Sequence, residues 1–104
     1  MRFPVAPDGS VTLPASHPLL RDGRYAPAAL VELAAQLAGR AVAAPAGHRG
    51  MLVEVQDCAL LAPASPGERV DPVVTLEHRM GGLHRFRVVL AGHLDTRLTL
   101  RVTE

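Results

Sequence analysis

The most informative segment of the chain is Pro27-Ala28-Ala29-Leu30-Val31-Glu32-Leu33-Ala34-Ala35-Gln36-Leu37-Ala38-Gly39. It predicts a helix over residues 27–42, because proline suits the first helical position, glycine suits the end, and apolar residues occur on nearly every side. Such a helix is normally wrapped by other structure. Glu32 and Gln36 lie one turn apart and so share a face. Because a buried carboxylate is costly unless it is paired or used, Glu32 is the first candidate for function.

The segments on either side of this helix predict strands. Before it, residues 1–24 are interrupted by prolines and glycines and can hold one short strand, over residues 9–13. After a loop over residues 43–50, alternating and β-branched patterns predict four strands. These strands are expected over residues 51–61, 69–79, 83–91 and 96–103, with turns at 63–67, 81–82 and 92–95.

The predicted strands also have clear apolar faces. In the third, Phe86, Val88 and Leu90 fall on one face together with His84, which we expect to be a half-buried structural residue. A helix followed by a run of strands indicates an α+β fold with an antiparallel sheet. A single sheet wrapped around the helix would explain why the helix has no polar face.

Length and composition limit the possible classes of protein. The 104 residues, 48% of them hydrophobic, fit a single globular domain over residues 1–104. The formal charge of +1 gives no basic field for nucleic acid, and no segment approaches the ~20 apolar residues of a membrane span. The single cysteine excludes an internal disulfide, and the histidines lack metal-ligand spacing. We therefore expect a cytoplasmic protein that has no metal site and binds neither nucleic acid nor membrane.

The order of elements and two motifs resemble the hotdog fold, and within it the 3-hydroxyacyl-ACP dehydratase family. That family has a histidine in a Pro/Gly-rich loop, a Pro-Gly pair opening the central helix, and an acid inside the helix followed by Ala-Gln. This chain has His17-Pro18, Pro27, Glu32 and Ala35-Gln36 in that order. The turn Pro66-Gly67-Glu68 is similar to the family's Pro-Gly-acid turn.

The chain departs from the family pattern at two places. It has His17-Pro18-Leu19-Leu20 where the family has His-Phe-Pro-Gly, and Ala28 where the family has glycine. With these differences the chain resembles the short, divergent dehydratase-like proteins of polyketide and aryl-polyene pathways more than it resembles the fatty-acid enzymes.

The resemblance implies a catalytic site that forms trans-2-enoyl thioesters from 3-hydroxyacyl thioesters on acyl carrier protein. His17 would remove the proton alpha to the carbonyl, and Glu32 would protonate the departing hydroxyl. The backbone N–H groups of Ala28 and Ala29 would hold the thioester oxygen, and Gln36 would support the site through hydrogen bonds to backbone. In the family the histidine and the acid meet across a dimer interface, so we expect a homodimer.

Three arginines flank the predicted helix and are candidates for contact with the acidic carrier protein: Arg21, Arg24 and Arg49. The resemblance implies no cofactor apart from the phosphopantetheine arm that carries the substrate. Two alternative functions stay open. A hotdog thioesterase would use the helix carboxylate to activate water and would not need His17. A non-catalytic hotdog subunit would bind acyl chains or complete a heteromer with another hotdog subunit.

Overall fold

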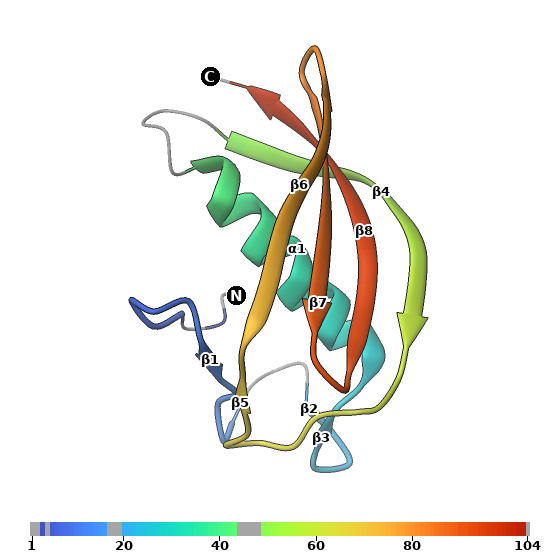
Figure 1. Ribbon diagram of the computed structural model, residues 1–104. Helices are drawn as coiled ribbons and strands as arrows, with labels where there is room; N and C mark the ends of the chain where they lie inside the picture. The colour runs from blue at the N-terminus through green and yellow to red at the C-terminus, as the bar shows by residue number, and fades with distance from the viewer. Residues whose placement is uncertain (1–2, 4, 17–19, 44–48, 104) are drawn as a thin grey trace.

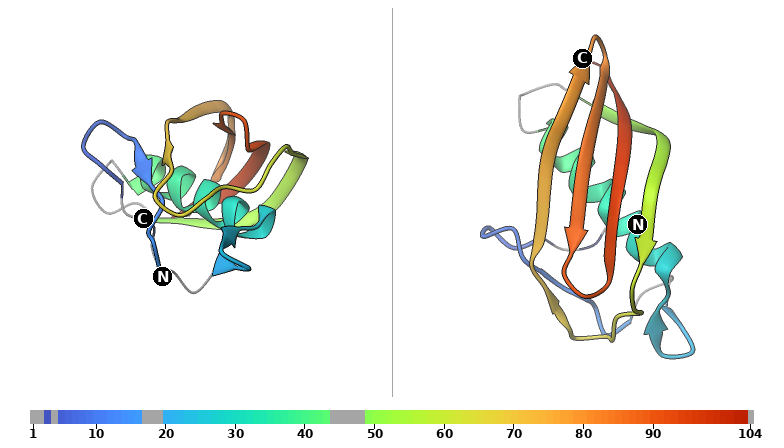
Figure 2. Two further views of the ribbon diagram at one scale, coloured as in Figure 1. Left: turned by 90° about the horizontal axis from the view of Figure 1, so that it is seen from below. Right: turned by 45° about the vertical axis from the view of Figure 1, so that its right-hand side comes forward.

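A curved antiparallel sheet crosses one central helix in the computed structural model, which describes residues 3, 5–16, 20–43 and 49–103 (Figures 1 and 2). The helix is α1 (Pro27–Ala43). The strands lie in the order β4-β8-β7-β6. Their bounds are Arg49–Leu60 for β4, Pro72–Met80 for β6, Leu83–Leu90 for β7 and Leu94–Thr103 for β8. The predicted α+β class, with one sheet against one helix, is confirmed.

Short strands extend this architecture at its lower end in Figure 1. Strand β1 (Val11–Thr12) pairs with β5 (Arg69–Val70), which is separated from β6 by Asp71 alone. Strands β2 (Leu20–Arg21) and β3 (Arg24–Tyr25) form a hairpin directly before α1. The predicted short strand over residues 9–13 is confirmed by β1, but the expectation that residues 1–24 hold only one strand is wrong.

A local sequence signal could have revealed the β2–β3 hairpin. Its two turn residues, Asp22 and Gly23, have φ values of 51° and 74°. A two-residue hairpin turn of this kind needs positive φ at both positions, and Asp-Gly is one of the pairs that supply it most readily.

The core lies between α1 and the concave face of the sheet. The helix contributes Leu33, Ala34, Leu37 and Ala38, all of which are buried. The sheet contributes the predicted alternating apolar residues of β7 and β8, including Val88, Leu98 and Leu100. Burying one such leucine fully is worth roughly 1.5–3 kcal/mol, so this face of the helix holds the fold together.

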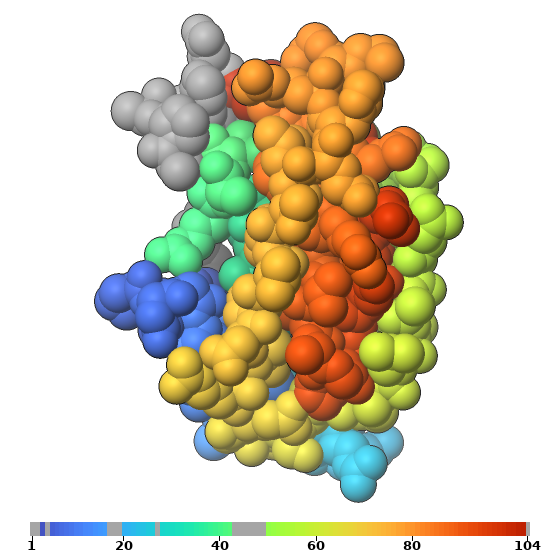
Figure 3. Space-filling model, in the orientation of Figure 1, coloured from blue at the N-terminus to red at the C-terminus, as the bar shows by residue number. Residues whose placement is uncertain are grey.

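The sheet does not cover the helix evenly. Helix α1 packs mainly against β4 and β8, less against β7 and least against β6. The space-filling view accordingly shows part of α1 uncovered beside β6 (Figure 3). The helix also passes through Gly39 and ends one residue after the expected boundary, at Ala43. The expectation that other structure wraps the helix on every side is wrong.

Candidate functional site

The candidate carboxylate lies on the outward side of α1. Glu32 is exposed, whereas its neighbours Leu33 and Ala34 are buried against the sheet. The expectation of a buried carboxylate is therefore wrong for this chain. The physical reason is that the residues around Glu32 on the outward side are small: Ala28 is exposed and Ala35 is half-buried. Alanine counts as apolar in a sequence pattern but gains little from burial, so the pattern overstated how much of the helix is wrapped.

Gln36 makes two hydrogen bonds that connect Glu32 to the N-terminal segment. Its Nε2 donates to Glu32 Oε1 at 3.2 Å, and its Oε1 accepts the backbone N–H of Phe3 at 2.8 Å. Phe3 is itself buried, with its ring centroid 5.8 Å from that of Tyr25. The Glu32 side chain is therefore oriented by an amide that the folded N-terminal segment holds in place.

The outer stripe of α1 consists of Ala28, Glu32 and Gln36, which follow one another at intervals of one turn. Ala28 lies in the first turn, where backbone N–H groups have no acceptor within the helix and the helix dipole is positive. Among the described residues, no backbone carbonyl accepts the Ala28 N–H. The Ala29 N–H already donates to the Ala26 carbonyl at 2.9 Å. Of the two predicted oxyanion donors, Ala28 is therefore the better placed.

The remaining predicted site residues are not all brought together. His17 lies outside the described residues. Arg21 and Arg24 are exposed and directly opposite each other in the β2–β3 hairpin, just before α1 begins. Arg49 begins β4, beyond the far end of α1, and a 17-residue helix is about 26 Å long. The three arginines therefore do not form one patch.

The structure also contains a histidine–carboxylate pair that the sequence analysis did not predict. His93 Nε2 contacts the Glu68 carboxylate, and His93 Nδ1 lies 3.0 Å from the Ala62 carbonyl oxygen. Because Glu68 lies in the Pro66-Gly67-Glu68 turn, this pair ties that turn to the β7–β8 connection. The acid of this turn has a structural partner.

Among the described residues, no group of three or more His, Cys, Asp or Glu side chains is placed to hold a metal ion. In the same part of the chain, no helix has the length and apolar character needed to cross a bilayer.

Comparisons with known proteins agree with the architecture. No protein-family model and no curated protein matches the sequence. The thioesterase HI1161 from Haemophilus influenzae superposes with a TM-score of 0.72 at 17% identity, over 91% of this chain and 71% of that one. The BH2602 protein from Bacillus halodurans, solved with CoA, gives a TM-score of 0.64 at 17% identity, over 90% and 66% of the two chains. At this level of identity the likeness concerns the fold, and the chain adopts the hotdog fold.

Proposed function

We propose that this protein hydrolyses acyl thioesters of phosphopantetheine, with Glu32 as the base that activates water. The observation that carries the proposal is the exposed Glu32 carboxylate oriented by the Gln36 amide. A base for hydrolysis has to meet water, and the outer stripe of α1 is open to it. A solved hotdog neighbour described as a thioesterase supports the same class of reaction.

The reaction can be written with the groups of the outer stripe. Glu32 takes a proton from water as the water oxygen attacks the thioester carbonyl carbon. Negative charge develops on the carbonyl oxygen, and the Ala28 N–H at the positive end of the helix is suited to receive it. The C–S bond then breaks, and the proton held by Glu32 passes to the departing sulfur. The products are a carboxylic acid and a free thiol, and the Glu32 carboxylate is restored.

The dehydratase mechanism is less well supported. It requires a sheltered carboxyl as general acid, and Glu32 is exposed in the single chain. It also requires His17, for which the described residues provide no geometry. Hydrolysis, the alternative left open by the sequence, therefore becomes the leading function, and dehydration becomes one outcome of its test.

We propose that a second copy of the chain completes the site by pairing along β4. This strand is at one edge of the four-stranded sheet and is 12 residues long. A long apolar edge strand is a template for pairing with another strand, and two identical edges pair with two-fold symmetry. Large apolar side chains on and just after β4 are exposed: Met51, Leu52, Val53, Val55, Leu60 and Leu61.

We also propose that the β2–β3 hairpin receives the carrier of the substrate. Arg21 and Arg24 are exposed beside the start of α1, so they can meet a phosphate or an acidic carrier protein near the outer stripe. The phosphopantetheine arm is common to CoA and acyl carrier protein, and the assay separates the two carriers. Arg49 starts a strand beyond the other end of α1 and is not part of this proposal.

The test is to incubate the protein with acyl and 3-hydroxyacyl thioesters of CoA and of acyl carrier protein, and to follow products by mass. Hydrolysis should give free acid and thiol, and Glu32→Gln should lower its rate by about 10²–10⁴-fold, the usual contribution of a general base. Asp71→Asn is the matched control, since Asp71 is an exposed carboxylate outside the outer stripe. Loss of water from the 3-hydroxyacyl thioester without hydrolysis would support the dehydratase reaction instead. No turnover, or full activity in Glu32→Gln, would overturn the proposal.

A further inference from the structure

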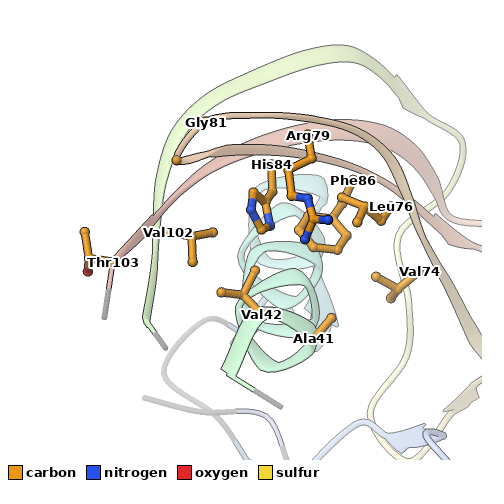
Figure 4. Close-up of a pocket in the computed structure, with 11 residues that line it drawn as sticks. Ala41, Val42, Val74, Leu76, Arg79, Gly81, His84, Phe86, Val102 and Thr103 are labelled. Atoms are coloured by element: carbon orange, nitrogen blue, oxygen red, sulfur yellow. The ribbon is translucent and has the colours of Figure 1, made fainter. Parts of the chain in front are cut away.

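A pocket of about 660 Å³ lies beside the last turn of α1, against the inner faces of β6 and β7 (Figure 4). It exists because α1 packs mainly over β4 and β8 and leaves the inner face of β6 poorly covered. The outer stripe is elsewhere on the molecule, since Glu32 and Val42 are separated by about 15 Å along the helix axis. The pocket is therefore a separate feature and not part of the proposed hydrolytic site.

The floor of this pocket is apolar. Val42 and Phe86 are buried there, and Val74 and Val102 are half-buried. Leu76 lines the same pocket and remains 46% exposed, although it faces the concave side of the sheet. A pocket of 300–1,000 Å³ with apolar walls and a few polar groups is the usual form of a small-molecule site.

A β-bulge determines which charged side chain of β6 enters the pocket. Leu76 is opposite Phe86, and both line the pocket. Regular alternation from Leu76 would place His78 on the same face, but the register shifts between Leu76 and His78. As a result the Arg79 side chain lines the pocket, while His78 lies opposite Arg85 in the strand register. Bulges that re-aim one side chain are common next to binding sites.

Arg79 and His84 therefore meet at the mouth of an apolar pocket. They are directly opposite partners on β6 and β7, and the close-up shows both side chains over the pocket floor (Figure 4). None of the described residues that line the pocket carries a carboxylate. The nearby Glu77 accepts from Arg97 Nε at 2.9 Å instead. No hydrogen bond or ion pair joins the Arg79 guanidinium to another described residue.

The Arg79 guanidinium is therefore placed to receive an anionic group at the mouth of this pocket. Its planar N–H groups can donate hydrogen bonds to a carboxylate or a phosphate.

We propose that the pocket binds an amphiphilic anion, with its apolar body against Val42 and Phe86 and its carboxylate or phosphate head at Arg79. The shared chemistry is one anionic head on an apolar chain. A free carboxylic acid and a phosphate ester are the two sources that the experiment distinguishes. The proposal does not depend on hydrolysis by Glu32, and its test measures binding alone.

The test is to titrate the protein with octanoate, octyl phosphate, 1-octanol and acetate, using calorimetry and two-dimensional NMR of backbone amides and histidine rings. At least one octyl anion should bind and shift the signals of residues 79–86, and the stronger of the two identifies the head group. Acetate lacks the apolar body and octanol lacks the charge, so each should bind at least about tenfold more weakly, a difference of about 1.4 kcal/mol.

Two arginines of one hairpin provide matched variants. Arg79→Gln should weaken binding of the octyl anion about tenfold, whereas Arg85→Gln, which alters an exposed residue outside the pocket, should leave binding unchanged within about twofold. Leu76→Ser should weaken binding several-fold through loss of apolar lining. The Glu32→Gln variant should still bind the octyl anion. The binding measurement therefore tests this proposal independently of the hydrolysis assay. Equal affinities of the two arginine variants, equal binding of octanol and octanoate, or no binding of either anion would overturn the proposal.

Discussion

Glu32 and Gln36 form a hydrogen-bonded pair on the outward side of α1, with Gln36 Nε2 3.2 Å from Glu32 Oε1. The other end of the same amide accepts the Phe3 N–H at 2.8 Å. Gln36 therefore has two separable roles. It orients the proposed base, and it fixes the N-terminal segment across the helix.

Substitution of Gln36 should separate these roles. In Gln36→Ala we expect kcat for thioester hydrolysis to fall about tenfold, because the carboxylate loses an orienting bond. The free energy of unfolding should also fall by about 1–2 kcal/mol, because the buried Phe3 backbone loses its acceptor. Gln36→Glu keeps an acceptor for Phe3 but cannot donate to Glu32, so it should lose activity with a smaller loss of stability. Steady-state kinetics and urea unfolding measure both effects, and equal stability losses in the two variants would contradict this division.

The edge of the sheet formed by β4 gives a prediction about assembly. Val53 is 47% exposed on β4, and Val53→Lys should convert a dimer to a monomer because lysine on an edge strand opposes pairing. Val73→Lys is the control, since Val73 is 58% exposed on β6 at the opposite edge. Light scattering during gel filtration gives the mass of each variant. A wild-type protein that is monomeric at all concentrations would refute the proposed pairing.

The Glu68–His93 pair predicts a stability effect at the acid of the Pro66-Gly67-Glu68 turn. Glu68→Ala removes the carboxylate next to His93 Nε2 and should lower the free energy of unfolding by about 1–3 kcal/mol. Asp71→Ala, at a nearby exposed carboxylate, should cost less than about 0.5 kcal/mol. Urea denaturation of both variants measures the difference. At urea concentrations below its unfolding transition, the Glu68→Ala variant should retain hydrolytic activity. Complete loss of that activity would show that Glu68 has a further role.

The Arg87–Asp95 pair predicts a dependence of stability on pH. Arg87 donates to both Asp95 oxygens, at 3.1 and 2.7 Å. These hydrogen bonds hold the pKa of Asp95 below its ordinary value of 3.8. Because the pKa is lower in the folded than in the unfolded state, the pair stabilises the fold above pH 3.8, and this contribution is lost as the pH falls through the lowered value.

The measurement is urea unfolding of wild type and Asp95→Asn at neutral pH and at successively lower pH. Wild type should be the more stable protein at neutral pH, and the difference should narrow once the pH is below 3.8. Added salt should also reduce the difference, since both side chains reach solvent. A difference that stays constant with pH would show that the carboxylate charge does not contribute.

Part of the candidate site could be predicted from spacing. The four-residue interval between Glu32 and Gln36 places their side chains on one helical face whatever surrounds the helix, and the structure has them hydrogen-bonded. Exposure of Glu32 could not be predicted in this way, because a pattern of alanines does not tell whether the sheet covers that face. The inward orientation of the Arg79 side chain could not be predicted either. One extra residue in β6 reverses the alternation that the sequence predicts.

The position of α1, the run of long strands after it and the apolar faces of β7 and β8 could all be predicted from the sequence. These features depend on local periodicity, which each segment carries within its own residues. The open side of α1, the strand at the sheet edge and the pocket beside Arg79 and His84 emerge only when the chain is folded. Those features depend on how far the sheet curves over the helix and on one shift of register, and both arise from contacts between residues far apart in the chain.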